Sequence, residues 1–423
     1  MLQQFNYFAF LLLLSYSLQA HTLLQLDENS NSQRDPIYST RKAIDNIAKA
    51  PTKDVSVVAS FKSMFYDAKV SGQLRLMYGD YNYKKTGADD TYATAVGGVI
   101  KYESASLNGF NGAAAVYTAH DIPFATGEEA NHNSELASEQ GSYTEMAEAY
   151  LNYRYQEFNL RAGRQILNTP LADSDDIRII SNTFEAYIFT YENEGFTFLA
   201  GNIQSWQGFD AGLESPWQKT GLSGTNLISV NYHDLWESNA WFYNITGKTN
   251  ASYVDGGIEY RESDTLLLHT LVQFLDEQEL SDSGVDTTIY GGLIEVVFHG
   301  LGFNLAYDKA VVANNKSSFS GVGGGTLFTS MGTMILDNIA INENAEALTY
   351  GLTYEINNFN FLYANGNFWS NSQEVGEQNM QIEYNFNDEF LVATIYAITE
   401  DKKQAAKTDY DWDRFQLLVN YNF

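Results

Sequence analysis

The last twelve residues of the chain alternate between apolar and polar side chains and end on an aromatic residue. Successive side chains of a β-strand point to opposite faces, so such a segment presents one apolar wall and one polar wall. A soluble sandwich could use the same alternation, but it has no need of a bare aromatic at its end. The apolar face holds Phe415, Leu417, Val419, Tyr421 and Phe423, and the polar face holds Arg414, Gln416, Asn420 and Asn422.

Composition restricts the class of protein further. The 423 residues include no Cys, which excludes disulfides and thiolate metal sites. The mean hydropathy of -0.29 is too polar for a bundle of membrane helices, and 29 Tyr with 26 Phe are too many for a disordered acidic chain. A transmembrane β-barrel fits, because half of each strand faces lipid and half faces water. No nucleic-acid partner is expected for a chain with a net charge of -29.

The N-terminus predicts export. Residues 5–14 form an apolar run of the length of a signal-peptide core, and small residues follow up to Ala20. The run is too short to cross a bilayer as a helix, and no Lys or Arg precedes it. We expect cleavage of a signal peptide at residues 1–20. Residues 21–68 are then an N-terminal periplasmic or lumenal segment, with a short helix predicted before Pro51; a mobile tail is the alternative.

From residue 69 onward the sequence predicts an antiparallel β-barrel of about 18 strands. Every second connection between the runs is only two to five residues long, whereas the others reach about 34 residues. Short turns on one rim and long loops on the other are typical of outer-membrane barrels, with periplasmic turns and extracellular loops. The predicted runs are 69–82, 92–103, 109–118, 144–155, 158–165, 184–191, 195–203, 224–233, 239–247, 251–260, 264–275, 286–298, 301–311, 346–355, 359–368, 377–386, 390–399 and 412–423.

Strand parity separates the two walls. In the first run Val70, Leu74 and Leu76 share the outer face, and similar apolar sets recur in the runs around residues 151 and 160. The opposite face carries polar and charged side chains, which stay charged only in water, so we expect a channel rather than a packed core. The predicted lumen-lining residues are Gln73, Arg75, Glu148, Arg154 and Arg414.

One segment resembles a known family. Residues 161–187 contain a Gly163-Arg164-Gln165 strand end, then Thr169-Pro170, an Asp-Asp-Arg cluster at 175, 176 and 178, and the return Phe184-Glu185-Ala186. This pattern resembles the third loop of OprD-type outer membrane porins, and more closely that of the major outer membrane porin of Campylobacter-like bacteria. Residues 68–75 also resemble the first strand of those porins.

The resemblance implies an 18-stranded barrel, often a homotrimer, whose third loop, about 166–183, folds into the lumen as a constriction. Apolar residues interleaved with charged ones would let this loop pack on the inner wall and present charge to the pore. A surface loop with a solvated acidic tip is the alternative. Strict alternation places Arg164 on the other face of the strand from Arg161. A lumenal Arg164 therefore requires a bulge or a position at the end of the strand. The predicted constriction residues are Asp173, Asp175, Asp176, Arg178, Arg161 and Arg164.

Charge indicates the direction of selectivity. Seven of 24 Lys and Arg and six of 53 Asp and Glu lie before residue 70, which leaves the barrel with 17 basic and 47 acidic residues. An acidic barrel draws cations into its mouths. We therefore expect an outer-membrane porin for passive diffusion of ions and small hydrophilic solutes, mildly cation-preferring. A channel for small carboxylates that uses a lumenal Arg row is the alternative.

Other functions have weaker signals. Asp173, Asp175 and Asp176 could form a weak divalent site for Ca²⁺, although they lack an EF-hand pattern, and no cofactor is expected otherwise. The His residues lie apart from any Gly-x-Ser-x-Gly motif, so we expect no enzyme. A non-conducting adhesive or structural barrel would need a plugged lumen. Residues 321–325 are interpreted as a flexible extracellular loop.

The predicted partners are outer-membrane lipid, a homotrimer and the barrel-assembly machinery. The last of these reads a terminal aromatic, here Phe423, in the barrels that this chain resembles. The predicted location is the outer membrane of a Gram-negative bacterium.

Overall fold

A computed structural model describes residues 56–175, 178–213, 216–234, 236–263, 266–319, 321–323, 327–404 and 406–423. The predicted signal peptide, the helix expected before Pro51, and Asp176 lie outside these residues. No helix in the described part of the chain has the length and apolar character needed to cross a membrane.

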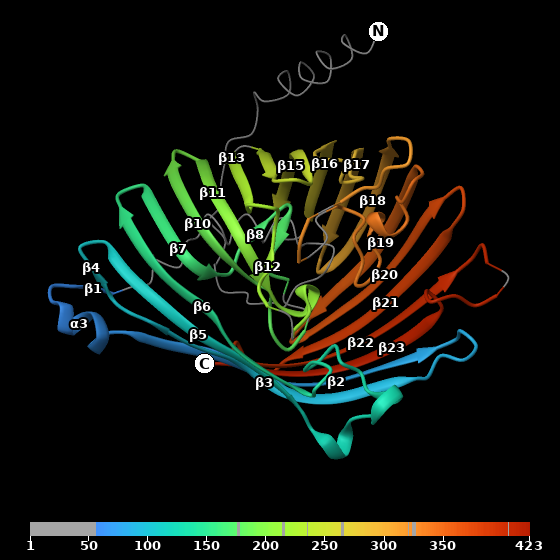
Figure 1. The fold of residues 1–423 in the computed structure, drawn as a ribbon, viewed down its shortest axis with the longest axis horizontal. Coiled ribbons are helices and arrows are strands. Elements are labelled where there is room, and N and C mark those ends of the chain that lie inside the picture. The colour runs from blue at the N-terminus through green and yellow to red at the C-terminus, as the bar shows by residue number, and fades with distance from the viewer. Residues whose placement is uncertain are drawn as a thin grey trace, which may run out of the picture. The chain divides into compact units, whose positions relative to one another are not determined.

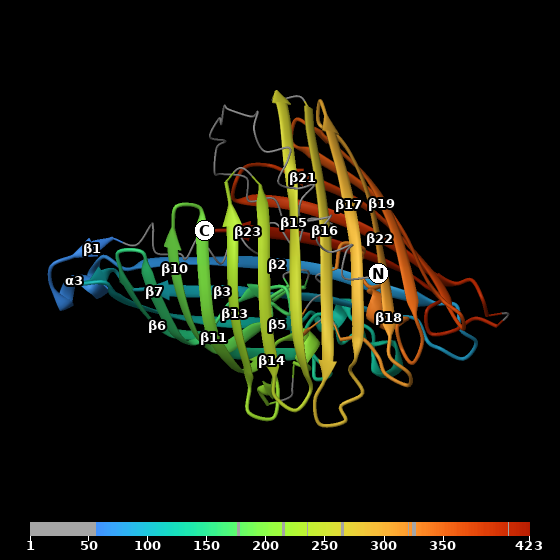
Figure 2. The same ribbon diagram turned by 90° about the horizontal axis from the view of Figure 1, so that it is seen from above.

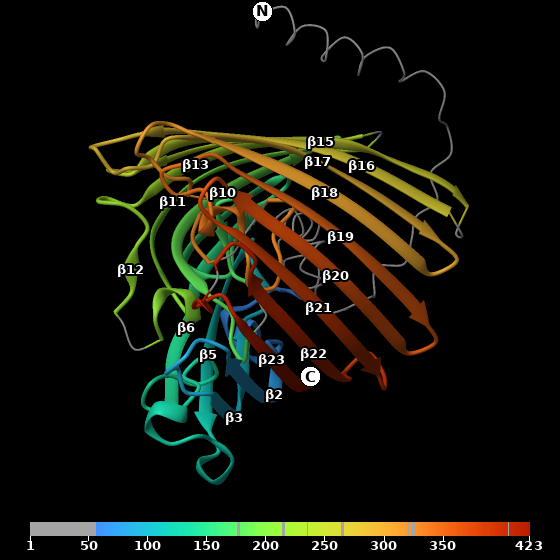
Figure 3. The same ribbon diagram turned by 90° about the vertical axis from the view of Figure 1, so that its right-hand side faces the viewer.

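Eighteen antiparallel strands form a closed ring, which runs from blue to red around the barrel in Figures 1 and 3. The ring closes where β2 pairs with β23, with Gln73 opposite Asn422 and Tyr83 opposite Trp412. The strands are β2 (Lys69–Tyr83), β3 (Thr91–Glu103), β5 (Phe110–Asp121), β6 (Ser142–Tyr155), β7 (Phe158–Gln165), β10 (Thr183–Asn193), β11 (Phe196–Gln207), β13 (Thr225–His233), β14 (Glu237–Ile245), β15 (Thr249–Ser263), β16 (Leu266–Glu279), β17 (Thr287–Phe298), β18 (Leu301–Val312), β19 (Ala345–Ile356), β20 (Phe359–Ser370), β21 (Glu374–Asn385), β22 (Phe390–Asp401) and β23 (Trp412–Asn422).

Several short elements are not strands of this ring. They are β1 (Val57–Val58), α3 (Phe61–Tyr66), β4 (Ser106–Leu107), β8 (Asn168–Thr169), β9 (Ala172–Asp173), β12 (Gln218–Lys219) and the 3-10 helices η3 (Pro123–Ala125), η4 (Glu129–Asn131), η5 (Phe209–Ala211) and η6 (Leu336–Asn338). β1 pairs with β4, β4 with β5, and β12 with β11, while β8 and β9 form a separate hairpin.

The two rims differ in their connections. We call the rim with the connections 104–109, 156–157, 194–195, 234–236, 264–265, 299–300, 357–358 and 386–389 the short-turn rim, and the opposite one the long-loop rim. Asn108, Gln156, His299 and Asn357 in these turns have φ between 51° and 53°, as tight hairpin connections with a right-handed strand twist require. The expected asymmetry of the connections is confirmed.

The outer wall is apolar. Strands such as β15 to β18, side by side in Figure 2, turn one side chain in two outward, and Leu151, Val272 and Ile100 are more than half exposed. Arg75, Glu148 and Asn152 lie on the opposite face and are almost fully buried. All eighteen predicted runs correspond to strands of the ring, with boundaries that shift by up to four residues. The predicted fold class is therefore confirmed.

Candidate constriction site

The connection between β7 and β10, residues 166–182, lies inside the ring. The Leu171 amide donates to the hydroxyl of Tyr243 on β14 at 3.4 Å. On the other side, the Arg75 side chain of β2 donates to the Arg178 carbonyl. The Ile179 side chain packs directly against Gly97 of β3, so closely that a Cβ at position 97 would lie only 2.7 Å from Ile179 Cγ2. Figure 1 shows β8 of this connection in the middle of the ring. The prediction that the third loop folds into the lumen is confirmed.

A small hairpin gives this loop its shape. β8 and β9 pair through Asn168 with Asp173 and Thr169 with Ala172, and the Ser174 hydroxyl accepts the Leu167 amide at 2.9 Å. Leu167 and Leu171 are almost completely buried, as are Ile179 and Ile180 beyond the hairpin. These apolar side chains hold the loop against the wall, as their interleaving with charged residues in the sequence predicts.

A second connection, residues 313–344, also packs inside the ring. Its Val322 pairs with Ala172 of the third loop, with Val322 accepting from the Asp173 amide at 3.1 Å. Its buried residues Leu327, Phe328, Met331 and Leu336 join the apolar cluster on the inner wall. The expectation of a flexible extracellular loop at 321–325 is therefore wrong for residues 321–323, while 324 and 325 lie outside the described residues. Local composition missed this because the contacts of Val322 are made with a segment about 150 residues away in the sequence.

Wall carboxylates hold this second loop by accepting hydrogen bonds from its backbone. Glu277 of β16 accepts the Phe319 amide at 2.9 Å, and Asp308 of β18 accepts the Thr329 amide at 2.9 Å. Glu377 of β21 accepts the amides of Thr333 and Met334 and the Thr333 hydroxyl, at 3.1, 2.7 and 2.7 Å. Buried carboxylates and buried backbone amides both need hydrogen-bond partners, so these contacts fix the loop over one side of the lumen.

Residues of the third loop meet residues of two other connections, 122–141 and 208–224, in one cluster. Arg178 lies 3.5 Å from the Glu135 carboxylate, and its guanidinium lies over the Phe209 ring at 4.7 Å from the ring centroid. The side-chain amide of Asn182 donates to Asp210 Oδ2 at 2.7 Å. A small pocket at this meeting point is lined by Asp175, Arg178, Ile180, Asn182, Phe209 and Asp210.

Burial and neighbouring charge both shift the pKa values of two side chains in this cluster, Arg178 and Asp210. Burial alone would lower the pKa of Arg178, but the Glu135 carboxylate, with Tyr81 and two aspartates, raises it above its usual range. Burial raises the pKa of Asp210, and the hydrogen bond from Asn182 and the charge of Arg178 oppose this only in part. The cluster therefore holds a permanent positive charge beside a carboxylate that binds a proton more readily than an exposed Asp.

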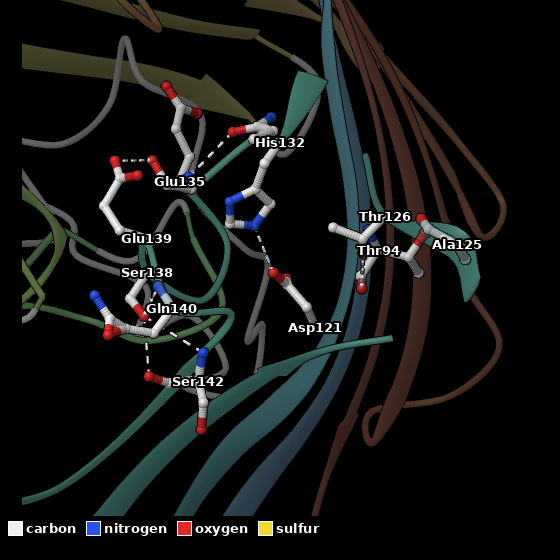
Figure 4. Close-up of polar contacts among 12 residues, drawn as sticks. Thr94, Asp121, Ala125, Thr126, His132, Glu135, Ser138, Glu139, Gln140 and Ser142 are labelled. Atoms are coloured by element: carbon white, nitrogen blue, oxygen red, sulfur yellow. Dashed lines mark hydrogen bonds and ion pairs between the residues drawn. The ribbon is translucent and has the colours of Figure 1, made fainter. Parts of the chain in front are cut away.

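The connection that carries Glu135, residues 122–141, is fixed by its own polar contacts (Figure 4). His132 Nε2 lies 2.6 Å from Asp121 Oδ2, and the Asn133 side chain accepts the Glu135 amide at 3.0 Å. The Ser138 hydroxyl donates to the Ser142 carbonyl at 2.9 Å. Tyr81 of β2 donates to Glu135 Oε1 at 2.8 Å. Glu135 is thus held at a defined position opposite Arg178.

The predicted constriction residues do not all lie together. Asp175 and Arg178 line the pocket. Asp173 is buried in the hairpin, where its carboxylate accepts the Asp175 amide at 3.5 Å, and Asp176 lies outside the described residues. Arg161 faces inward and donates to Asn152 at 3.3 Å.

Arg164 lies on the other face of β7 from Arg161, as strict alternation requires. It pairs in register with Ala149 and Glu185, donates to Glu145 at 3.1 Å, and lies over the Trp217 ring. Arg164 is therefore separate from the cluster around Arg178.

The predicted lumen-lining residues share the inward face of their strands. Arg75 donates to Asn420 at 3.0 Å, and Arg414 donates to the Tyr81 hydroxyl at 3.1 Å. Glu148 pairs with Lys101 at 2.7 Å, and Arg154 lies 3.9 Å from Glu192 near the short-turn rim. Gln73 has the same parity as Arg75 and is partly buried.

Sequence reasoning missed Glu135, Asn182, Phe209 and Asp210. These residues belong to three different connections and have no shared motif or spacing, so only the fold brings them to Arg178. Among the described residues no group of three or more His, Asp or Glu could hold a metal ion. The weak divalent site at Asp173, Asp175 and Asp176 stays a prediction.

Comparisons with known proteins support the fold. The sequence matches no family model and no curated protein. The structure is similar to Pseudomonas aeruginosa OccK9 (OpdG), with a TM-score of 0.74, 13% identity, and coverage of 85% of this chain and 99% of that chain. Acinetobacter baumannii OccAB3 has a TM-score of 0.72 and 14% identity, with coverage of 85% of this chain and 99% of that chain. P. aeruginosa OpdK with vanillate has a TM-score of 0.69 and 16% identity, with the same coverage of both chains.

These structures are OprD-type porins, so the resemblance seen in the third loop extends to the whole barrel at the level of fold. The closer resemblance to the porin of Campylobacter-like bacteria stays a prediction. At 13 to 16% identity the likeness defines the architecture and leaves function to the chemistry of the lumen.

Proposed function

We propose that this protein is an outer-membrane channel for the passive diffusion of ions and small hydrophilic solutes, with a mild preference for cations. The apolar outer wall of a closed ring fits a lipid bilayer, because a closed ring leaves no backbone edge unpaired in lipid. The neighbours of known structure include one described as the outer membrane protein OpdK of P. aeruginosa. We propose no catalytic role.

The observation that carries this proposal is the number of polar atoms on the inner wall that lack a hydrogen-bond partner within the described protein. Many of its buried side-chain atoms have no hydrogen-bond partner within the described protein, including both side-chain atoms of Asn304, Asp255 Oδ2 and Glu277 Oε1. The buried hydroxyls of Thr190, Thr287, Thr349 and Thr399 also have no hydrogen-bond partner there. Polar groups buried without partners cost free energy, and water supplies the missing bonds. Ordered water inside the barrel would satisfy these groups, which supports the proposed channel.

The inner wall is also divided by charge. The arc from β23 through β2 and β3 to β7, called the basic arc, carries Arg414, Arg75, Lys101 and Arg161, with Glu148 of β6 paired to Lys101. The acidic arc of β15 to β22 carries Asp255, Glu277, Glu295, Asp308, Glu377, Glu383 and Asp401. The acidic arc is the larger, and the net charge of -29 has the same sign. Potential inside a narrow pore is focused by its low-dielectric walls, which favours cations.

The test is single-channel recording in a planar bilayer with a KCl gradient, for the wild type and for Asp175→Asn/Asp210→Asn. We expect large open steps, a reversal potential on the cation side, and a smaller cation preference in the variant. Asp282→Asn/Asp388→Asn removes two exposed aspartates from other connections and serves as the control. Silence from protein that migrates as a folded, heat-modifiable barrel contradicts a channel and favours a structural barrel plugged by residues 313–344.

A channel for small carboxylates is a second candidate. It is favoured by the basic arc, where Arg161 Nη2 and Arg414 Nε have no hydrogen-bond partner in the described structure. A carboxylate in the pore would bind these guanidinium groups. This candidate predicts that millimolar succinate interrupts the KCl current and that Arg161→Gln removes the interruption. An uninterrupted current favours the general pore.

We further propose that the chain is exported through a cleaved signal peptide and inserted by the barrel-assembly machinery through Phe423. We also propose that it works as a homotrimer, as the barrels that it resembles often do. Mass measurement of the purified protein and N-terminal sequencing test the oligomer and the cleavage after Ala20.

A further inference from the structure

We infer that α3 is a membrane anchor, which inserts its aromatic side chains into the headgroup region of the leaflet on the short-turn side. This inference depends on the proposed membrane location of the barrel but not on conduction. Its ligand is a phospholipid surface.

The contacts of α3 place it at the outer edge of the short-turn rim. The Ala105 amide, in the connection after β3, donates to the Met64 carbonyl at 2.9 Å. The Tyr102 hydroxyl donates to the Phe65 carbonyl at 3.2 Å. Tyr102 shares the outward face of β3 with Val96 and Ile100, so the helix lies beside the apolar outer wall and not in the lumen.

The side chains of α3 are exposed in a way that a helix in water avoids. Phe61, Phe65 and Tyr66 are 69%, 52% and 79% exposed, and the helix has no buried residue. The two Phe rings contact each other edge-on, with centroids 5.1 Å apart. Three exposed aromatics within six residues mark an interaction surface.

Exposed aromatic residues recur along most of the short-turn rim, but not at the rim ends of β2 and β16. They form a belt of Tyr102, Phe110, Tyr155, Phe158, Phe196, Trp236, Tyr260, Phe298, Phe359, Phe386, Tyr421 and Phe423. Such belts mark the membrane–water boundary of transmembrane barrels. The rim end of β2 contributes only Val70 to the outer face. Because α3 directly precedes β2, its aromatics complete the belt at this gap.

Charge and size favour lipid over a second copy of the chain as the occupant. Lys62 and Lys69 are exposed, with Lys62 Nζ 5.3 Å from the centroid of the Tyr66 ring, and Asp67 is the one acid between them. Lysines beside aromatics suit anionic headgroups. A six-residue helix offers far less than the roughly 800 Å² per partner of a stable protein interface.

The absence of cysteine allows a direct test by single nitroxide labels. Labels at Tyr66→Cys, at Phe110→Cys in the belt and at Glu157→Cys in an exposed turn are compared in the full-length barrel, reconstituted in phosphatidylcholine and phosphatidylglycerol vesicles. Accessibility to oxygen and to a water-soluble nickel chelate gives the depth of each label. We expect Tyr66→Cys to match Phe110→Cys, with high oxygen and low nickel accessibility, and to differ from Glu157→Cys.

The outcomes separate the two proposals. If Tyr66→Cys matches Glu157→Cys while Phe110→Cys lies in lipid, the anchor is wrong and the membrane location stands. If Phe110→Cys is also aqueous, the membrane location itself fails. Broadening between Tyr66→Cys labels that grows with protein density would identify a second copy as the occupant and overturn the lipid anchor.

A second variant tests the cause. Phe61→Ser/Phe65→Ser leaves the ring of strands intact, because α3 lies outside it. In this background we expect the label at Tyr66→Cys to shift to the accessibility of the aqueous turn. An unchanged depth would show that the aromatic side chains do not hold the helix in the membrane, which contradicts the inference.

Discussion

Arg178 is the residue at which the charged contacts of the candidate constriction meet. It binds Glu135 and lies over Phe209, while Asp210 lies in the same pocket. Because guanidinium stays protonated at every working pH, only the carboxylates of this cluster can change charge with pH. Burial raises the pKa of Asp210, so we expect this carboxylate to carry the first pH response of the candidate constriction.

Replacement of Asp210 tests this response. As pH falls, the raised pKa makes Asp210 bind a proton before an exposed Asp does, so the cation preference of the wild type should begin to fall above the usual titration range of Asp. Protonation also stabilises the folded loop, since the folded state binds the proton more tightly than the unfolded state. Reversal potentials recorded from pH 7 to pH 4 should show this early fall in the wild type and in Asp282→Asn. A fall that persists in Asp210→Asn contradicts the assignment.

Glu377 gives a second prediction at this scale. Its carboxylate accepts two amides and one hydroxyl of the loop 313–344, and each such bond to a charged group contributes about 1.5–3 kcal/mol. We expect Glu377→Ala to speed hydrogen exchange at Thr333 and Met334 by about 100-fold, the equivalent of about 3 kcal/mol, and to increase the open conductance.

Glu383→Ala is the matched control. It removes an equally buried carboxylate from the same face of the same strand, but one that binds Asn360 and Asn385 instead of the loop. Equal exchange rates in the two variants would show that charge, and not the contact with the loop, controls its opening.

At the scale of elements, the strands and turns were predictable and the inward loops were predictable only in part. Alternation with a period of two is a local signal, and so are the residues that tolerate positive φ at Asn108 or Asn357. The inward path of residues 166–182 was reached through a family resemblance. The path of 313–344 depends on Glu277, Asp308 and Glu377, which lie on distant strands, so no local pattern predicts it.

The turn at Gln156 gives a prediction for elements. Gln156 has φ of 52°, a left-handed conformation that costs a residue with a Cβ about 1 kcal/mol, whereas Gly adopts it freely. We expect Gln156→Gly to raise the free energy of unfolding by about 0.5–1 kcal/mol, measured by urea titration in detergent. Glu157→Gly, at the neighbouring position without positive φ, should instead lower it.

At the scale of the whole molecule, Phe423 combines a structural and a proposed cellular role. Its backbone exchanges two hydrogen bonds with Gly72, at 2.9 and 3.0 Å, and its ring stacks on Tyr421 on the outer face. Phe423→Ser keeps the backbone bonds. Purified Phe423→Ser should therefore refold in detergent to the same heat-modifiable barrel as the wild type.

In cells the same variant should accumulate less in the outer membrane, because the proposed terminal signal for assembly is lost. Phe298→Ser, which removes another exposed aromatic of the belt, should accumulate normally. Equal losses in the two variants would mean that the belt in general, and not the terminal position, governs assembly.

The pairing of β2 with β23 also sets an order of events in the making of this protein. Arg75 and Asn420, which share a hydrogen bond, are 345 residues apart, so the ring cannot close before its last strand has been synthesised. Until then both ends of the growing sheet are open to other chains. A protein chain that ends before β23 would leave a permanently open sheet edge. For this protein a premature stop near the C-terminus is therefore more harmful than the few residues lost would suggest.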